Sequence, residues 1–397
     1  MPTILQIDSS ANASSHGKIA EAIGRLAMSQ GWRSVMAYGR RMNPSQSELI
    51  HIGTSFDLKE HGLESRLLDN HGLASRRATK EFLHKVDEIK PDIIQLHNIH
   101  GYYLNYKLLF EYLNSTNIPV VWTLHDCWSF TGHCAHFVTA GCEKWKSGCT
   151  SCPLSRDYPK SYIDRSKRNY ELKKSLFVAK DNLHVVTVSD WLAGIVKESY
   201  FGNKDIRVIK NGVNLDVFKP MNNYRSKDCF YILGVASVWT DDKGFADYYR
   251  LSELLSGDEF IVLVGVSEKI KKSLPHNIIG VSRTESIEGL VAWYNKADVV
   301  LSMSKAETYG ITIAEALACG TPVIVYDNTA QPELLSGDVG YIVENGDVQM
   351  LYNRIQIIKT NGKDSYTKQC RFHAEREFDI NRKYAEYLQL YNSIIQR

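Results

Sequence analysis

The sequence predicts an α/β protein with two domains, each built on a parallel β-sheet covered by helices. The chain has 397 residues, which is too long for one ordinary core and suits two domains of roughly 150 to 200 residues. In both halves, short apolar runs of strand length alternate with longer segments of helical periodicity. Such alternation is typical of parallel sheets whose strands are connected by helices.

The first half begins with a strand, a loop and a helix. Thr3–Asp8 is a short apolar strand, Ser9–Gly17 is a polar loop, and Lys18–Gln30 has helical periodicity that ends at Gly31. Similar units follow. They comprise a helix over Ser75–Lys90 and strands over Pro91–His97, Ile118–His125, Leu183–Ser189 and Ile206–Lys210.

The second half restarts after the polar stretch Asn222–Asp228, which is typical of a linker or a long loop. Good helix formers occupy Ile311–Cys319, and Gly320 stands where helices commonly stop. The last periodic segment is Arg382–Ile395. The strands predicted in this half are Cys229–Ala236, Glu259–Val266, Asn277–Val281, Ala297–Ser304 and Thr321–Tyr326.

Bulk composition favours a cytoplasmic enzyme. Apolar residues make up 44% and charged residues 23% of the chain, as in ordinary globular proteins. We find no apolar stretch long enough for a membrane span and no signal peptide at the N-terminus. The net charge of +2 argues against nucleic acid as a partner. Basic clusters at Arg165–Arg168 and Lys173–Lys174 are either solvated helix faces or a peripheral contact with the inner face of a membrane.

The most informative stretch surrounds two glutamates, Glu307 and Glu315. Glu307 follows a predicted buried strand, so it lies at the carboxyl end of a parallel sheet, where such sheets bind ligands. The amides of Tyr309, Gly310 and Ile311 open the next helix and are placed to receive a phosphate. Glu315, two turns into that helix, can accept hydrogen bonds from a diol. The alternative is a pair of solvent-facing glutamates with no ligand.

This stretch resembles the Glu-x7-Glu signature of retaining glycosyltransferases of the GT-B fold, in the large family 4. The run Glu-Ala-Leu-Ala-Cys-Gly-Thr-Pro-Val-Ile at 315–324 matches that family closely. The resemblance implies two Rossmann-like domains that face each other across a cleft. The acceptor domain would span 1–205 and be completed by a C-terminal helix at 376–397, and the donor domain would span 206–375. Glu307 would contact the donor sugar, and Glu315 the ribose of the nucleotide.

Other positions agree with the resemblance. His125 alone would be a structural residue at a strand end, but the family places there a histidine that contacts the donor sugar and supports the reaction centre. His97 and Asn98 match a strand end where acceptor contacts are common. Asn211 lies in an Asn-Gly turn and would line the cleft. Gly17 belongs to the loop near the donor phosphate or the acceptor.

A diphosphate in a cleft needs compensating charge. In the family an Arg and a Lys hold it, and Lys243 fits the Lys position, before Gly244. Val238 and Trp239 occupy the neighbourhood of the Arg. Either Lys243 and the helix N-terminus suffice, or another basic residue substitutes, with Lys305, Arg283 and Lys210 as candidates. The donor-binding set is thus Lys243, Arg283 in the nucleobase loop Ser282–Ser286, Glu307, Thr308, Tyr309, Gly310, Ile311 and Glu315.

A cysteine-rich insert occupies 127–153. Four of its cysteines suggest a structural zinc site, because thiolates can enclose Zn²⁺ in a tetrahedron. These are Cys134, Cys142, Cys149 and Cys152, with Cys127 and His133 as spare candidates. The spacings match no standard finger, so free or partly oxidised thiols, or an iron-sulfur cluster, remain alternatives. The insert follows His-Asp-Cys-Trp at 125–128, which resembles a family 4 subgroup of polysaccharide-assembly enzymes, and it would form a lid over the acceptor pocket.

The resemblance therefore implies a retaining glycosyltransferase. It would move a sugar from a nucleotide diphosphate sugar, UDP- or GDP-linked, to a sugar or lipid-linked glycan in bacterial surface polysaccharide biosynthesis, with no catalytic cofactor. His125 and Glu307 would be the catalytic residues. The rivals are another GT-B enzyme, namely a nucleotide-sugar epimerase or a phosphorylase, and a nucleotide-sugar-binding assembly factor without catalysis.

Overall fold

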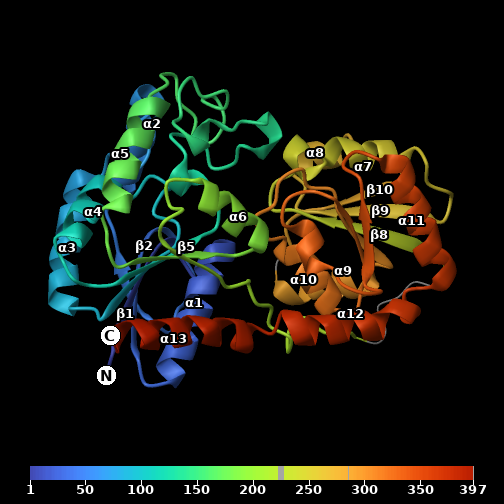
Figure 1. The fold of residues 1–397 in the computed structure, drawn as a ribbon. Helices are drawn as coiled ribbons and strands as arrows, with labels where there is room; N and C mark the ends of the chain where they lie inside the picture. The colour runs from blue at the N-terminus through green and yellow to red at the C-terminus, as the bar shows by residue number, and fades with distance from the viewer. Residues whose placement is uncertain (222–227, 285, 397) are drawn as a thin grey trace. The chain divides into compact units, whose positions relative to one another are not determined.

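The computed structural model describes residues 1–221, 228–284 and 286–396. The chain divides into two compact units, shown as a ribbon in Figure 1. Unit 1 comprises Met1–Lys210 and Lys383–Arg397, and unit 2 comprises Asn211–Arg382. The sequence had assigned 206–210 to the second domain and 376–382 to the first, so both boundaries move by a few residues. Most of the predicted linker Asn222–Asp228 lies outside the described residues.

Unit 1 is built on a parallel sheet with the strand order β3-β2-β1-β4-β5-β6-β7. Its strands are β1 Thr3–Ala11, β2 Arg33–Met42, β3 Glu48–His51, β4 Ile93–Leu96, β5 Val120–Leu124, β6 Leu183–Thr187 and β7 Asp205–Val208. Its helices are α1 Ser14–Ser29, α2 Ser55–Leu68, α3 Arg76–Ile89, α4 Tyr106–Asn114, α5 Ser166–Val178 and α6 Asp190–Glu198. Strand order reverses between β1 and β4, which makes the edge beside them the expected ligand position.

Unit 2 repeats this architecture with the order β10-β9-β8-β11-β12-β13. Its strands are β8 Phe230–Val235, β9 Glu259–Val264, β10 Ile278–Val281, β11 Val299–Ser302, β12 Val323–Tyr326 and β13 Gly340–Val343. Its helices are α7 Phe245–Ser252, α8 Glu268–Lys271, α9 Ile287–Lys296, α10 Ile311–Ala318, α11 Val348–Asn361 and α12 Asp364–Glu377. Here the order reverses between β8 and β11.

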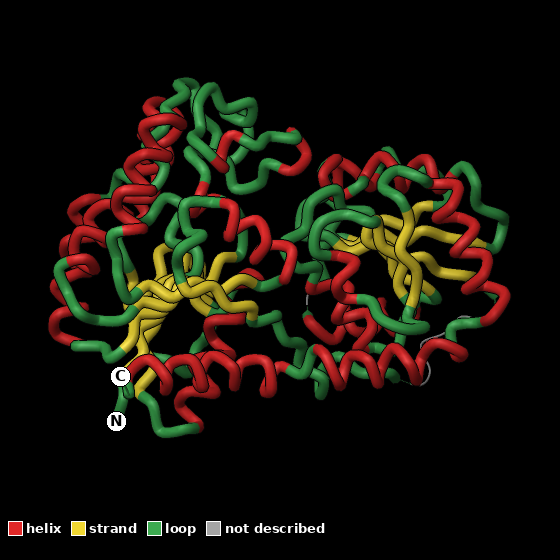
Figure 2. The backbone as a smooth tube through the Cα atoms, in the orientation of Figure 1, coloured by secondary structure: helices red, strands yellow, loops and turns green. Residues whose placement is uncertain are grey.

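Each sheet is the centre of a hydrophobic core, because helices cover its faces (Figure 2). The central strands β4, β5 and β12 are buried along their whole length. Strands buried on both faces need continuous apolar runs, which is why the sequence pattern located them. From the sequence we did not predict β2, whose last three residues are exposed, or the edge strands β3 and β13, whose four residues include exposed positions.

The predicted loop Ser9–Gly17 is mostly regular structure. Strand β1 continues to Ala11, and α1 begins at Ser14, four residues earlier than the apolar periodicity indicated. A Cβ at Gly17 would lie 2.6 Å from the backbone oxygen of Ser10. Gly17 therefore lets the first turn of α1 approach the end of β1, a steric requirement that a polar sequence does not reveal.

The last helix, α13 Ile380–Ile395, starts in unit 2 and packs its later turns into unit 1. The Tyr387 hydroxyl lies 3.0 Å from Oγ1 of Thr123, and the Tyr391 hydroxyl donates to Oε1 of Gln95 at 2.9 Å. Both tyrosines are buried. Unit 1 thus takes part of its core from the end of the chain.

The insert between β5 and α5 is mostly loop, with short 3₁₀ turns at Trp128–Phe130, Val138–Ala140 and Lys144–Lys146 (Figure 1). Lys173, which the sequence analysis placed in a basic surface cluster, is buried beneath the insert. The Lys173 ammonium donates to the backbone oxygens of Trp128 and Thr131 at 2.8 and 3.2 Å. It also lies 3.4 Å from the Trp128 ring centroid, so Lys173 is not available to a membrane surface.

Within the described part of the chain, none of the helices combines the length and the apolar character that crossing a bilayer requires.

Candidate active site

In unit 2, Lys243 and Glu307 lie on either side of the point where strand order reverses. Lys243 ends a 3₁₀ turn, Asp241–Lys243, that follows β8, and Glu307 lies in the loop after β11. The Lys243 ammonium and the Glu307 carboxylate form a half-buried ion pair. Ser304 Oγ donates to the same carboxylate at 3.1 Å. The structure therefore brings together two residues that the sequence assigned separately to the diphosphate and the donor sugar.

Backbone contacts fix the loop that carries Lys243 against the loop that carries Glu307. The amide of Lys305 donates to the backbone oxygen of Asp242 at 2.8 Å. Gly244 has a φ of +69°, and a Cβ there would lie 2.3 Å from the backbone oxygen of Met303. Only glycine combines this left-handed conformation with so close an approach. The glycine after Lys243 is therefore required for the position of the lysine.

Helix α10 begins directly after this loop. Its N-cap is Gly310, with a φ of +97°, and Ile311 is its first residue. The side chain of Tyr309 is buried and donates to the backbone oxygen of Asn211 at 2.6 Å. The hydroxyl of Tyr309 is therefore engaged within unit 2. The buried Asn211 keeps its Oδ1 without a hydrogen-bond partner among the described residues.

Glu315 is half-buried in the second turn of α10. The Tyr294 hydroxyl, from α9, donates to Glu315 Oε2 at 2.8 Å. Burial, together with the neighbouring Glu315 carboxylate, raises the pKa of Tyr294 well above its usual value. Tyr294 therefore stays a hydrogen-bond donor at neutral pH and orients Glu315. A carboxylate has several acceptor positions, so Glu315 can accept from more than one donor.

The family's diphosphate-binding Arg has no local replacement at 238 and 239. Val238 is exposed, and the buried Trp239 donates from Nε1 to the backbone oxygen of Val264 at 3.0 Å. Among the substitutes that we considered, Lys210 lies in unit 1 and pairs with Asp190 at 2.8 Å. Arg283 is exposed and Lys305 is half-buried.

In unit 1, a polar cluster lies at the carboxyl ends of β1, β4 and β5. His16 Nδ1 lies 2.8 Å from the buried carboxylate of Asp8. His97 Nδ1 lies 3.1 Å from His125 Nε2, and the two rings stack with centroids 5.4 Å apart. The rings of His16 and His125 are 6.1 Å apart. This cluster occupies the ligand position expected for the unit 1 sheet.

The histidines of this cluster differ in the direction in which their pKa values are shifted. Burial lowers the pKa of His97 and of His125 to about 3, so both rings are neutral at neutral pH. Burial also opposes protonation of His16, but the Asp8 carboxylate outweighs it, and the pKa of His16 is raised. His97 is buried behind His125, so the acceptor contact that the sequence predicted for it would require the ring to be uncovered. Asn98 is half-buried and accepts from the Tyr103 hydroxyl at its backbone oxygen.

Asp126 is held by a second network. His100 Nε2 lies 2.8 Å from Asp126 Oδ2, and His100 Nδ1 lies 3.1 Å from the Tyr158 hydroxyl. Burial favours the protonated carboxyl, but the interaction with His100 outweighs it, and the pKa of Asp126 falls below its usual value. The amide of Trp128 also donates to Asp126 at 2.9 Å. Asp126 therefore anchors the start of the insert.

The cysteines predicted to bind zinc, Cys134, Cys142, Cys149 and Cys152, line one small pocket with His133. All eight cysteines of the chain carry free thiols. His133 Nδ1 lies 2.6 Å from a buried Asp69 carboxylate oxygen, and its Nε2 has no hydrogen-bond partner within the described segments. Across those same segments, no three or more His, Cys, Asp or Glu side chains already have a metal-binding arrangement. Zinc binding stays a prediction.

Several residues of the two clusters were not predicted. Asp8 and His16 come from the first strand and helix, and Tyr294 comes from α9. The only signal for His16 was a histidine in a serine-rich stretch after the first strand. Tyr294 gave none, because a tyrosine in an amphipathic helix is typical of a core residue.

Comparison with known proteins identifies the family. The model described as Glycosyltransferase Family 4 matches residues 20–217, and the model described as Glycosyl transferases group 1 matches residues 231–361. The chain belongs to glycosyltransferase family 4. It is an enzyme of the hexosyltransferase type.

Two relatives of this family 4 enzyme are named for the synthesis of bacterial polysaccharides. It is 27% identical over 275 residues to the putative colanic acid biosynthesis glycosyl transferase WcaC of Escherichia coli, a match that covers 66% of each chain. The matched region thus spans about two thirds of that relative. It is also 27% identical over 200 residues to the O-antigen chain mannosyltransferase RfbU of Salmonella typhimurium, covering 47% of this chain and 53% of RfbU.

Solved structures establish the fold as GT-B, as the sequence predicted. Sucrose-phosphate synthase from Thermosynechococcus elongatus superimposes with a TM-score of 0.74 at 17% identity and covers 100% of both chains. HepE of Anabaena, in complex with UDP and glucose, has a TM-score of 0.67 at 16% identity and covers 99% of this chain and 100% of that chain.

Proposed function

We propose that this family 4 enzyme transfers a hexosyl group from a UDP- or GDP-sugar to a hydroxyl of a sugar or lipid-linked glycan, with retention at the anomeric carbon. The transfer would serve the assembly of a bacterial surface polysaccharide, the process named for its relatives WcaC and RfbU. Unit 2 would bind the donor and unit 1 the acceptor. The observation that carries the proposal is the Lys243–Glu307 pair at the carboxyl ends of β8 and β11.

The ion pair suits a donor that carries both sugar hydroxyls and a diphosphate. With no ligand bound, each charge compensates the other. When a nucleotide sugar enters, the diphosphate would take the place of Glu307 as the partner of Lys243, and Glu307 would accept hydrogen bonds from sugar hydroxyls. Neither charge is then left unpaired in a half-buried site, which would be costly.

Departure of the nucleotide diphosphate develops negative charge on the leaving oxygen. Lys243 and the amides of Gly310 and Ile311 would stabilise that charge, which is commonly the largest single contribution to catalysis. Glu315, oriented by Tyr294, would hold the ribose. His125 would contact the sugar from the acceptor side of the reaction. No covalent nucleophile is invoked, in keeping with attack on the same face from which the leaving group departs.

The donor is identified by thermal unfolding with a panel of UDP-, GDP- and ADP-sugars. A ligand present at about a hundred times its dissociation constant adds roughly 2.7 kcal/mol of stability, so the true donor should raise the unfolding temperature by several degrees. Incubation of that donor with glycan acceptors, followed by NMR of the product, should show transfer with an unchanged anomeric configuration. An inverted product would contradict retention.

The same assay separates the alternatives. An epimerase would convert the donor with no acceptor present, and a phosphorylase would release a sugar phosphate when inorganic phosphate is added. A binding factor would show the thermal shift without any product. We expect turnover only when donor and acceptor are both present.

A further inference from the structure

Three polar side chains in unit 1 form a hydrogen-bonded chain across neighbouring strands. Gln6 lies on β1, His97 follows β4, and His125 follows β5. Gln6 Oε1 lies 3.2 Å from His97 Nε2, and His97 Nδ1 lies 3.1 Å from His125 Nε2. At its other end, Gln6 Nε2 donates to the backbone oxygen of Ala20 in α1 at 2.8 Å. Gln6 and His97 are buried.

The contact with Ala20 sets the direction of the whole chain. A backbone oxygen can only accept, so the amide nitrogen of Gln6 must face Ala20 and Oε1 must face His97. A reversed amide would place Oε1 of Gln6 against the backbone oxygen of Ala20 in a buried site. Burying polar groups without a hydrogen bond costs on the order of 2 to 7 kcal/mol. Gln6 therefore presents an acceptor to His97.

From this acceptor the tautomers of both histidines follow. A neutral imidazole has one N–H donor and one acceptor nitrogen, and burial keeps both rings neutral. His97 must donate from Nε2 to Gln6, so its Nδ1 is the acceptor. His125 must then donate from Nε2 to His97 Nδ1. Nδ1 of His125 consequently carries the lone pair.

We propose that Gln6 is a positioning residue that, through His97, holds His125 as its Nε2–H tautomer, so that Nδ1 of His125 is an acceptor and not a donor. The substrate part of this inference rests on the proposed function. In transfer, Nδ1 of His125 accepts a hydrogen bond from a sugar hydroxyl, and an analogue with fluorine or an ether oxygen at that hydroxyl is rejected. The neighbouring charged and titratable groups are His97, His16, Asp8 and Asp126.

The tautomer is measured directly on the full chain without ligand. Protein labelled with ¹⁵N-histidine gives long-range ¹H–¹⁵N correlations that distinguish a protonated ring nitrogen from an unprotonated one. The His125 signals are assigned by their loss in His125→Gln. At neutral pH we expect a protonated Nε2 and an unprotonated Nδ1 for His125. The opposite tautomer, an even mixture or a doubly protonated ring would overturn the proposal. This outcome does not depend on any transfer activity.

Two matched variants test the role of Gln6. Gln6→Met removes the acceptor at similar volume and should move the His125 tautomer ratio by about fivefold, the effect of one net hydrogen bond. Gln95→Met is the control, because Gln95 is equally buried on β4 but bonds to Thr123 and Tyr391. A wild-type pattern in Gln6→Met, or the same shift in Gln95→Met, would overturn the role. If Gln6→Met does not fold, the wild-type spectrum decides.

Once the donor is known, kinetics connect the tautomer to transfer. Gln6→Met should lower kcat/KM by the same factor as the fall in the Nε2–H fraction of His125 that the spectra measure. The same substitution in a His125→Gln background should have no further effect, because the coupling between the two sites is then absent. Equal losses in both backgrounds would mean that Gln6 acts through packing alone, which would overturn the proposal.

Discussion

At the scale of single residues, the candidate site is assembled from small sets of mutually dependent side chains. Lys243 and Glu307 balance each other's charge, and Tyr294 orients Glu315. Asp8 raises the pKa of His16, whereas burial lowers the pKa of His125. Each dependence predicts what a substitution at one partner does to the other.

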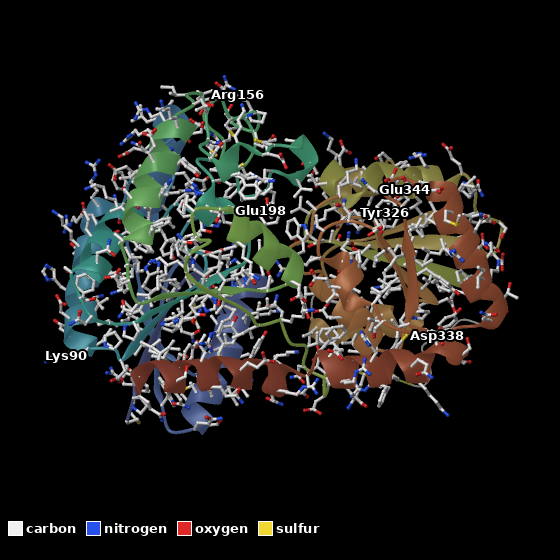
Figure 3. All side chains as sticks on the ribbon, in the orientation of Figure 1. Lys90, Arg156, Glu198, Tyr326, Asp338 and Glu344 are labelled. Carbon is white, nitrogen blue, oxygen red and sulfur yellow. The ribbon has the colours of Figure 1, made fainter. Side chains whose placement is uncertain are left out.

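Replacing Glu307 by Ala should nearly abolish transfer and leave the fold intact. The side chain is half-buried in a loop, and partly exposed ion pairs contribute only about 0 to 1 kcal/mol to stability. The measurement is the initial rate with the true donor, with thermal unfolding as a check of the fold. Glu344→Ala is the matched control, since this exposed carboxylate of unit 2, labelled in Figure 3, should keep full activity. Wild-type turnover in Glu307→Ala would refute the assignment.

Glu315→Gln should mainly weaken nucleotide binding. The change replaces a charge-assisted acceptor by a neutral amide, and a hydrogen bond to a charged group contributes about 1.5 to 3 kcal/mol. Calorimetry with the free nucleoside diphosphate measures the loss. Tyr294→Phe removes the bond that orients Glu315 and should weaken binding by less. Unchanged affinity in both variants would exclude Glu315 from the nucleotide site.

The His16–Asp8 pair should make stability depend on pH. Because the pKa of folded His16 is raised above 6.5, its contribution is fully present below pH 6.5 and is lost as pH rises through the higher folded pKa. His16→Gln should therefore destabilise unit 1 by about 1 kcal/mol in mildly acidic buffer and by less in alkaline buffer. Denaturant titrations of both proteins at the two pH values measure this. A difference that grows with pH would contradict the ion pair.

The sequence predicted some of these residues and not others for a physical reason. Glu307 and Glu315 lie on one loop and the helix after it, so a single contiguous pattern identified both. Asp8 and His16 gave no such pattern, because only the parallel register of β1, β4 and β5 brings them beside His125, which the sequence did predict. Contacts made by register leave no local pattern in the sequence.

At the scale of elements, the strands buried on both faces were located from the sequence, whereas β2 and the edge strands β3 and β13 were not. Tyr326 illustrates the first group. It ends the fully buried β12 (Figure 3), and its hydroxyl donates to Asp247 at 3.0 Å. The insert has only short 3₁₀ turns, because no periodic apolar pattern organises it. Its order depends on aromatic contacts, buried pairs and the cysteine pocket.

If the cysteine pocket binds zinc, purified protein should contain close to one Zn²⁺ per chain. Cys149→Ser or Cys152→Ser should release the metal and destabilise unit 1, because binding to thiolates contributes to folding. Acceptor binding should then decrease more than donor binding, since the insert begins beside His125. Elemental analysis of protein purified without chelator measures the zinc. Cys229→Ser, outside the pocket, is the control. If the protein contains no metal and both pocket variants keep full activity, the cysteines are packed thiols and the zinc prediction is wrong.

At the scale of the whole molecule, length and strand–helix alternation sufficed to predict two parallel-sheet domains. The exact boundaries did not follow from the sequence, because no change of composition marks Lys210 or Arg382. The chain passes between the two units after Lys210 and again after Arg382. Helix α13 begins in unit 2 and ends in the core of unit 1.

Truncating a buried side chain of α13 should destabilise unit 1 and spare unit 2. Leu388 is buried, and Leu→Ala substitutions at such positions cost about 2 to 5 kcal/mol. Ile395→Ala, at an exposed position of the same helix, should change stability by less than about 0.5 kcal/mol. Hydrogen exchange read separately on the β1 and β8 amides measures each unit. Equal loss of protection in both units would contradict a local role.

The place of α13 also has a consequence for synthesis on the ribosome. Domains usually fold in the order in which they emerge, the N-terminal one first. Here the residues that cover Thr123 and Gln95 are translated only after the whole of unit 2. During synthesis, unit 1 therefore has an incomplete hydrophobic core. Its folding is completed only when α13 has left the exit tunnel of the ribosome.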